Sequence, residues 1–295
     1  MNKVYNTVWN ESTGVWVVTS ELTRKGGRRP RQIRRTALAG LIAGLLLPSA
    51  PALAVDYNNE TLGNGGTSSS MSVSAGDTAT NTTINSGGFQ HVFSGGSATG
   101  TTINSGGMLS VSSGGSAVDI TQNSGGIIFA DTSATLRGTN INGSFSIAGG
   151  SASNMLLENG GYLSVLNGHQ ATSTTINSGG FQYVFSGGSA TSTTINSGGQ
   201  QRVSGGGSAT GTTISGGYQN VSSGGSATGT TINSGGQQRV SSGGSATGTT
   251  INSGGEQRVS SGGSATSTTI NRGGYQYVFS GGSATSTTIN SGGNQ

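Results

Sequence analysis

The chain of 295 residues contains no cysteine and few charged, aromatic or proline residues. Without cysteine it can hold neither a disulfide framework nor a thiolate metal site. Low hydrophobicity with much glycine usually indicates disorder, but disordered chains are also rich in charge and proline. Here only 7% of the residues are charged, and all three prolines precede residue 55. This composition does not match that of a typical disordered chain.

The basic balance of the sequence belongs to its N-terminal segment, 1–54. This segment carries eight Lys or Arg and two Glu, a net charge of +6, whereas residues 55–295 carry five Arg and seven Asp or Glu, a net charge of −2. A nucleic-acid-binding protein needs a basic patch on its mature chain. The sequence therefore predicts no nucleic-acid partner.

Residues 24–54 have the layout of a cleavable secretory signal. Seven Lys or Arg precede an apolar run at 37–47, and a small-x-small site precedes Val55. The alternative is a transmembrane anchor, but eleven residues span only about 16 Å as a helix, against a hydrocarbon core of about 30 Å. We therefore predict that residues 1–54 are a signal peptide, cleaved near Ala54 and Val55.

An extension, 1–23, precedes this signal and contains both tryptophans, Trp9 and Trp16. Ordinary signal peptides lack such an extension. Its sequence, MNKVYNTVWNESTGVWVVTSE, resembles the extended signal peptide region of large Gram-negative autotransporters and two-partner secretion exoproteins. The resemblance implies Sec-dependent export, with the extension slowing translocation across the inner membrane.

From about Leu62 onward the chain repeats one pattern of nineteen residues, such as INSGGFQYVFSGGSATSTT at 176–194. The first position of the pattern is occupied by Ile84, Ile103, Ile141, Ile176, Ile195, Ile214, Ile232, Ile251, Ile270 and Ile289. Gln122 and Leu157 fill the two gaps, and the pattern is shortened only between Ile141 and Leu157 and between Ile214 and Ile232. A fixed period near twenty is typical of stacked, quasi-one-dimensional architecture.

Each unit contains two Gly-Gly pairs that bracket two short segments. Glycine adopts positive φ without steric cost, so the pairs predict corners. The segments, 181–185 and 189–195 in one unit, are rich in β-branched and aromatic residues and predict strands. Nineteen residues at about 3.3 Å each suffice for three short sides, and coils about 4.8 Å apart would pair every backbone group.

We therefore predict an all-β fold, a right-handed parallel β-helix (β-solenoid) of about a dozen 19-residue coils. Residues 55–83 would form degenerate N-terminal coils, and residues 84–295 the regular repeats. An autotransporter ends in a β-barrel translocator with alternating strands of about ten residues, and the sequence contains none. We expect a fragment of a longer protein, the alternative being a truncated reading frame.

The alternation of residues along each segment predicts which side chains point inward. Val184 and Gln182 exemplify two columns that should share the inner face, with the glutamines stacked as an amide ladder. The alternative places the glutamines near a corner, in contact with water. In the second segment, Ala190 and Ile195 cannot both point inward unless the chain bends near Ser192.

The outer face of the first segment carries aromatic residues in some coils and arginine in others. Exposed aromatic and arginine side chains favour recognition, so this face is a candidate contact surface, the alternative being a column that only stabilises stacking. The candidate residues are Phe181, Tyr183, Phe185, Tyr275, Tyr277, Phe279, Arg202, Arg239 and Arg258.

No arrangement of residues in the mature chain predicts catalysis. His91 and His169 lie far apart in the sequence and in non-equivalent repeat positions, which predicts solvated side chains. The acidic residues share no repeat column, which argues against paired catalytic carboxylates. Calcium-binding GGxGxD repeats, the GxSxG elbow and the phosphate-binding GxxxxGK[ST] motif are absent. We predict that the chain is not an enzyme and holds no metal and no cofactor.

The repeat INSGG-x-Q-x-V-x-SGGSATxTTI resembles the passenger of the AIDA-type self-associating autotransporter adhesins over residues 60–295. The resemblance implies a parallel β-helix on the outer membrane of a Gram-negative bacterium, mediating host-cell attachment, autoaggregation and biofilm formation. It implies as partners like molecules on neighbouring cells, a host-cell receptor of unknown identity, and the Sec and outer-membrane assembly machineries. A structural stalk that presents a distal domain is the alternative, and an exported enzyme is a third.

Some members of that family carry heptoses O-linked to serine and threonine of the repeats. The threonine before each repeat isoleucine should point outward and could be offered to a heptosyltransferase. The candidate O-glycosylation residues are Thr102, Thr175, Thr194, Thr213, Thr231, Thr250, Thr269 and Thr288.

Overall fold

The computed structural model describes residues 5–10, 15–20 and 53–295, in which every regular element is a β-strand. The chain divides into two units, residues 1–53 and 54–295. In the first unit β1 (Tyr5–Asn10) and β2 (Val15–Ser20) pair antiparallel. The apolar run of the predicted signal peptide, 37–47, lies outside the described residues. Within those ranges, no helix is long and apolar enough to cross a membrane.

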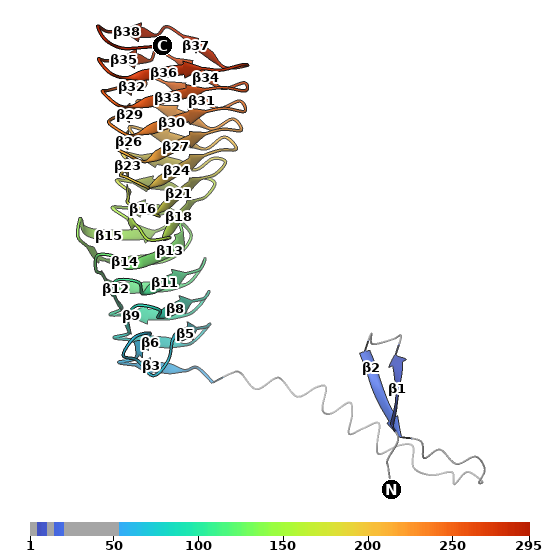
Figure 1. Ribbon diagram of the computed structural model, residues 1–295. Coiled ribbons are helices and arrows are strands. Elements are labelled where there is room, and N and C mark those ends of the chain that lie inside the picture. The colour runs from blue at the N-terminus through green and yellow to red at the C-terminus, as the bar shows by residue number, and fades with distance from the viewer. Residues whose placement is uncertain (1–4, 11–14, 21–52) are drawn as a thin grey trace, which may run out of the picture. The chain divides into compact units, whose positions relative to one another are not determined.

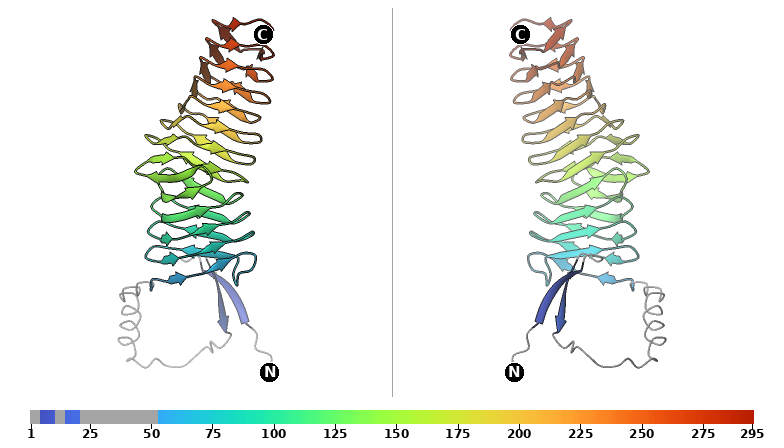
Figure 2. Two further views of the ribbon diagram at one scale, coloured as in Figure 1. Left: turned by 90° about the vertical axis from the view of Figure 1, so that its left-hand side faces the viewer. Right: turned by 90° about the vertical axis from the view of Figure 1, so that its right-hand side faces the viewer.

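The second unit is a stack of coils in which each regular coil contributes three short strands (Figure 1). Outside residues 135–153, each strand pairs in parallel with its equivalents in neighbouring coils, and the unit consists of three sheets seen side-on in Figure 2. The pairing joins residues one repeat apart, as between Phe181 and Gln200. The predicted all-β parallel solenoid of about a dozen coils is confirmed.

From residue 156 onward the strands of the three sheets follow one another in each coil, whereas in the earlier coils the equivalent two-residue strands belong to the 17-stranded sheet. The 11-stranded sheet consists of β5 (Ser70–Val73), β8 (Phe89–Val92), β11 (Met108–Val111), β13 (Ile127–Asp131), β18 (Tyr162–Val165), β21 (Phe181–Val184), β24 (Gln200–Val203), β27 (Tyr218–Val221), β30 (Gln237–Val240), β33 (Glu256–Val259) and β36 (Tyr275–Val278). The 8-stranded sheet consists of β17 (Leu156–Leu157), β20 (Thr175–Ile176), β23 (Thr194–Ile195), β26 (Thr213–Ile214), β29 (Thr231–Ile232), β32 (Thr250–Ile251), β35 (Thr269–Ile270) and β38 (Thr288–Ile289). The 17-stranded sheet consists of β3 (Asp56–Asn58), β4 (Thr61–Leu62), β6 (Thr78–Thr80), β7 (Thr83–Ile84), β9 (Ser97–Thr99), β10 (Thr102–Ile103), β12 (Ser116–Gln122), β14 (Thr135–Asn140), β15 (Gly143–Ala148), β16 (Ser151–Ser153), β19 (Gln170–Thr172), β22 (Ser189–Thr191), β25 (Ser208–Thr210), β28 (Ser226–Thr228), β31 (Ser245–Thr247), β34 (Ser264–Thr266) and β37 (Ser283–Thr285).

The interior of the stack contains the predicted glutamine ladder. Gln182 and Val184 are fully buried, so the prediction of two inward columns is confirmed and the wet-corner alternative is wrong. Gln201 Nε2 donates to Gln182 Oε1 at 2.7 Å and to Thr193 Oγ1 at 3.1 Å. The ladder continues through Gln219, Gln238, Gln257 and Gln276. Because each amide bonds to its neighbours and to buried threonines, these polar groups are satisfied without water.

The predicted bend at Ser192 is present. Ser192 has φ +55° and separates β22 from β23, and the side chains of both Ala190 and Ile195 are buried. Other coils place glycine, serine, asparagine or aspartate at this corner, residue types that tolerate the left-handed region or bond locally to the backbone.

The Gly-Gly corners are present, but the two glycines of a pair have different roles. Gly179 has φ +75°, as predicted. Gly180 does not have positive φ; a Cβ atom there would lie 2.2 Å from the carbonyl oxygen of Leu157 in the preceding coil. The first glycine supplies the turn, and the second lets adjacent coils approach each other.

A β-hairpin interrupts the repeats between β13 and β18. β14 and β15 pair antiparallel, and β16 pairs antiparallel with β15. The interpretation of Ile141 as an inward repeat position is therefore wrong, because Ile141 lies in the turn of the hairpin and is 78% exposed. Asn140 Oδ1 accepts a bond from the backbone N–H of Asn142 at 2.8 Å, and Gly143 has φ +108°, which together form the turn.

Candidate contact surface

The outer face of the 11-stranded sheet brings together all the predicted contact residues. The strands alternate, so the first and third residues of each point outward, while the second and, except for Val278, the fourth are buried. The register places the third residues in one column, which consists of Tyr183, Arg202, Asn220, Arg239, Arg258 and Tyr277. The first residues form a second column, which consists of Phe181, Gln200, Tyr218, Gln237, Glu256 and Tyr275.

The predicted aromatic contact residues form two clusters on this face. Phe181 and Tyr183 have ring centroids 6.2 Å apart, and Tyr183 and Phe185 are 6.1 Å apart. The second cluster repeats these spacings with Tyr275, Tyr277 and Phe279. Phe185 is 44% exposed and lies just beyond its strand, at the corner. The first cluster has coils on both sides, so it presents apolar area to solvent that the stacking of coils does not cover.

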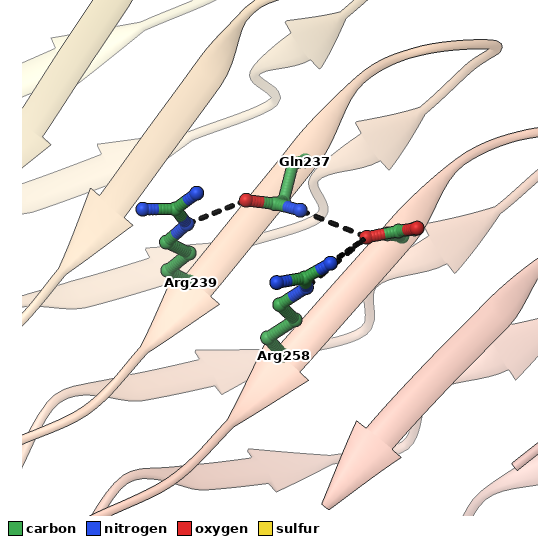
Figure 3. A network of polar contacts seen from close by, with 4 residues as sticks. Gln237, Arg239 and Arg258 are labelled. Atoms are coloured by element: carbon green, nitrogen blue, oxygen red, sulfur yellow. Dashed lines mark hydrogen bonds and ion pairs between the residues drawn. The ribbon is translucent and has the colours of Figure 1, made fainter.

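Two of the three arginines between the clusters, Arg239 and Arg258, belong to one network of polar contacts (Figure 3). Arg239 Nε donates to Gln237 Oε1, and Gln237 Nε2 donates to Glu256 Oε2 at 2.8 Å. Arg258 is paired with Glu256 at 2.9 Å, so its charge is compensated locally.

Two of the arginines also lie against aromatic rings. The guanidinium carbon of Arg239 is 5.4 Å from the ring centroid of Tyr218, and that of Arg258 is 5.9 Å from the centroid of Tyr277. Both distances lie within the range of cation–π attraction. The network and the ring contacts hold these long side chains along the sheet, which lowers the conformational entropy that a partner would have to remove.

A hollow of about 230 Å³ opens on the same face where the repeat is interrupted; its lining includes Ser112, Phe129, Asp131, Tyr162, Ser164 and Phe185. Sequence reasoning missed this hollow. The available signal was the segment after Ala130, where Asp131-Thr132-Ser133-Ala134 replaces the usual corner with its Gly-Gly pair.

The two histidines differ from the prediction of solvated side chains. His91 Nε2 lies 2.8 Å from Ser112 Oγ, and its ring stacks on Phe93 with centroids 3.7 Å apart. Burial lowers the pKa of His91, which favours the neutral ring. His169 Nδ1 lies 2.8 Å from Thr132 Oγ1. Both rings are half-buried, because each packs against a neighbouring coil.

The predicted glycosylation threonines lie on other sides of the coils. Seven of the eight are on the 8-stranded sheet, and Thr102 is on the 17-stranded sheet. All are half-buried except Thr288, which is exposed. More exposed threonines, which the sequence did not single out, end the strands of the 17-stranded sheet, as at Thr191 and Thr210.

A stack of parallel coils with aromatic and polar side chains along one outer face defines a β-solenoid protein. The chain belongs to the AIDA family, described as adhesin of bacterial autotransporter system, probable stalk, whose profile matches residues 58–107, 137–199, 214–255 and 242–293. Residues 1–50 match the extended signal peptide of the Type V secretion system. The leader therefore directs the chain to the export machinery, and the protein is located at the outer membrane or cell surface of a Gram-negative bacterium.

Two curated relatives share the repeats. The chain is 72% identical over 205 residues to the autotransporter CRAC of Citrobacter rodentium (strain ICC168), a match that covers 57% of this chain and 13% of the relative. It is 79% identical over 92 residues to the autotransporter adhesin/invasin TibA of Escherichia coli O78:H11 (strain H10407 / ETEC), covering 31% of this chain and 9% of the relative. The matched part is thus a small share of each relative.

A solved structure has the same architecture. It is described as a fragment of TibA, hyper-glycosylated in a reaction catalysed by TibC, and it is 49% identical to this chain with a TM-score of 0.55. The match covers 81% of this chain and 96% of that fragment.

Proposed function

We propose that the chain is the passenger part of a surface adhesin that mediates host-cell attachment, autoaggregation and biofilm formation. The observation that carries the proposal is the outer face of the 11-stranded sheet, where exposed aromatic and arginine side chains form continuous columns. Such side chains dominate the energetics of protein recognition. The proposed partners are like molecules on neighbouring cells and a receptor on the host cell.

The contact residues would be the two aromatic clusters and the arginines between them. The local pairing of Arg258 with Glu256 reduces the net charge of this face. Recognition would therefore depend on aromatic contact area and directional hydrogen bonds more than on long-range attraction. The alternative, that these columns only stabilise stacking, requires that their removal lower stability without changing adhesion.

The adhesion proposal is tested on cells that display the full-length protein. We expect these cells to clump, settle faster and bind cultured host cells better than cells carrying an empty vector. Unchanged settling together with no gain in host-cell binding would show that the protein is not an adhesin.

A structural stalk is the second candidate function, favoured by the family description as a probable stalk. A stalk needs only a rigid stack that separates its ends, which the parallel pairing of successive coils supplies. The two functions are distinguished by shortening the protein by two whole coils, 232–269. Loss of attachment in proportion to length favours a stalk, whereas a surface adhesin retains attachment through its remaining contact residues.

We infer that a glycosyltransferase, of the heptose-transferring kind, modifies threonines that precede the repeat isoleucines. The TibA fragment, 49% identical to this chain, is hyper-glycosylated, which supports the proposal. Half-burial in the folded coil favours modification before folding, when the hydroxyl is accessible. Mass spectrometry of peptides from the exported protein should find glycans on Thr175 or Thr194. Glycans confined to the more exposed Thr191 or Ser192 would contradict this choice of residues.

We propose further that the chain has no enzymatic activity and that signal peptidase cleaves it near Ala54 and Val55. The relatives named adhesins support a non-catalytic role. N-terminal sequencing of the exported protein should begin at Val55.

A further inference from the structure

We propose that the hollow between β13 and β18 binds one pyranose ring of a neutral saccharide. This inference rests on the proposed adhesin function, because the hollow lies on the proposed contact face. It adds the class of ligand that this one site would bind. The hollow has a volume of about 230 Å³, room for a single sugar ring, and it opens on the exposed outer face of the 11-stranded sheet.

The site arises from a change of register. In regular coils the first residues of neighbouring strands pair, as Met108 does with Ile127. Between β13 and β18 the third residue, Phe129, pairs instead with the first residue, Tyr162, and Asp131 pairs with Ser164. This shift by two residues keeps the inner face intact, because side chains alternate with period two. On the outer face it sets a carboxylate beside small side chains.

Aromatic rings form the walls of the hollow. Phe129 and Tyr162 have centroids 5.2 Å apart and are inclined by 56°, so the two rings do not cover each other's faces. Tyr162 is 40% exposed, and Phe185 on the opposite side is 44% exposed. The C–H face of a pyranose is apolar and packs on the electron-rich face of an aromatic ring.

The remaining lining is polar and suits hydroxyl groups. Asp131 Oδ1 accepts bonds from the backbone N–H of Ser133, at 2.8 Å, and from its hydroxyl. Its other carboxylate oxygen receives no hydrogen bond within residues 53–295, so it can accept from a ligand. Ser164 also lines the hollow, and its hydroxyl can both donate and accept, whereas Ser112 Oγ is already hydrogen-bonded to His91 Nε2 at 2.8 Å. Adjacent hydroxyls of a sugar match this set, with the bond to the carboxylate strengthened by charge.

A cationic side chain is the competing ligand, because aromatic rings and a carboxylate also attract cations. The hydroxyl of Ser164 favours the sugar, since it offers a donor that a cation cannot use. Two sources could supply a pyranose: glycans of the host cell, or sugars carried by a second copy of the protein.

The test uses the exported full chain and saturation-transfer NMR with D-glucose, D-galactose, D-mannose and L-glycero-D-manno-heptose as probes. We expect at least one probe to bind with a dissociation constant on the order of 1–10 mM. Tyr162→Ala and Asp131→Asn should each weaken binding about tenfold or more. Tyr218→Ala is the matched control, a tyrosine 38% exposed on the same face that neither lines the hollow nor belongs to the two aromatic clusters, and it should leave binding unchanged.

Absence of saturation transfer from all four probes would overturn the proposal, as would equal binding by the Tyr162→Ala, Asp131→Asn and control variants. Saturable binding of Nα-acetyl-lysine methylamide in place of the sugars would also overturn it. Should the bound sugar inhibit only host-cell attachment, the source is a host glycan; should it inhibit clumping, the source is a second copy, and either result supports the site. If the cells attach but the chain binds no sugar, the sugar site is refuted while the proposed adhesin function is not.

Discussion

Residues in the interior contribute hydrogen bonds as well as buried apolar area. Each glutamine of the ladder donates to the preceding glutamine and to a buried threonine, and its oxygen accepts from the next glutamine and a second threonine. Leu109 and Leu163 occupy the same column in coils outside the ladder, so the site also accepts an apolar side chain of similar size. The ladder therefore ties neighbouring coils to one register, because a break leaves buried polar groups unpaired.

Replacement of one ladder glutamine tests this account. Gln219→Leu would leave a donor of Gln238 Nε2 and the hydroxyl of Thr230 without their acceptor. We expect the unfolding free energy to fall by about 2–4 kcal/mol, from two unsatisfied buried donors. Urea denaturation followed by circular dichroism measures the change. Gln200→Leu, on the outer face of the adjacent coil, is the control, and an equal effect of both variants would refute the ladder's role.

At the scale of the element, the corners determine the course of the chain more than the strands do. Strands of two to four residues cannot hold their conformation alone, and their positions are determined by the turns between them. The two glycines of each pair have different roles at the corner: the first adopts positive φ, and the second permits contact between coils.

Substitution of the second glycine of a pair should therefore be the more damaging. Gly180→Ala would force the chain away from Leu157 in the coil below and cost about 3 kcal/mol or more. Gly87→Ala, at the first glycine of the pair Gly87-Gly88, with φ +75° and no atom within 4 Å of the new Cβ, should cost only about 1 kcal/mol. Thermal denaturation compares the two. A larger loss for Gly87→Ala would contradict the assignment of roles.

Most of the fold could be predicted from the sequence, because the same pattern of residues recurs in nearly every coil. The inward valine and glutamine columns and the bend at Ser192 follow from alternation alone. The hairpin could not be predicted, since Ile141 matches the repeat locally and only pairing with distant residues excludes it from the core. The contact columns follow from the period, but the hollow at Asp131 depends on a register shift that no local pattern encodes.

For the whole molecule, the solenoid is a chain of nearest-neighbour interfaces whose strength varies along the stack. The interface at the hairpin is weaker than those between regular coils. β13 and β18 pair over three residues, against four between β21 and β24, and the glutamine ladder begins only at Gln182. Gln122 Oε1 is buried in this region without a hydrogen-bond partner among the described residues.

Hydrogen exchange should reveal this weak interface. We expect backbone amides at 132–161 to exchange about ten times faster than those at 200–260, because local opening there breaks fewer contacts. Mass spectrometry of peptides from the two regions provides the comparison. Uniform protection along the stack would mean that the hairpin is as stable as the regular coils.

The measurement that most directly tests the central claim is the settling and host-cell attachment of bacteria that display a contact-face variant. Its substitutions are Tyr183→Ala, Arg202→Ala, Arg239→Ala and Tyr277→Ala. The control changes four exposed threonines of the 17-stranded sheet, with Thr191→Ala, Thr210→Ala, Thr228→Ala and Thr247→Ala, and both variants are compared at equal surface display.

The account predicts that the contact-face variant loses most of the clumping and attachment of the wild type, by about tenfold or more, while the control retains them. Full retention of both activities by the contact-face variant, at equal display, would contradict the claim that this face is the adhesive surface.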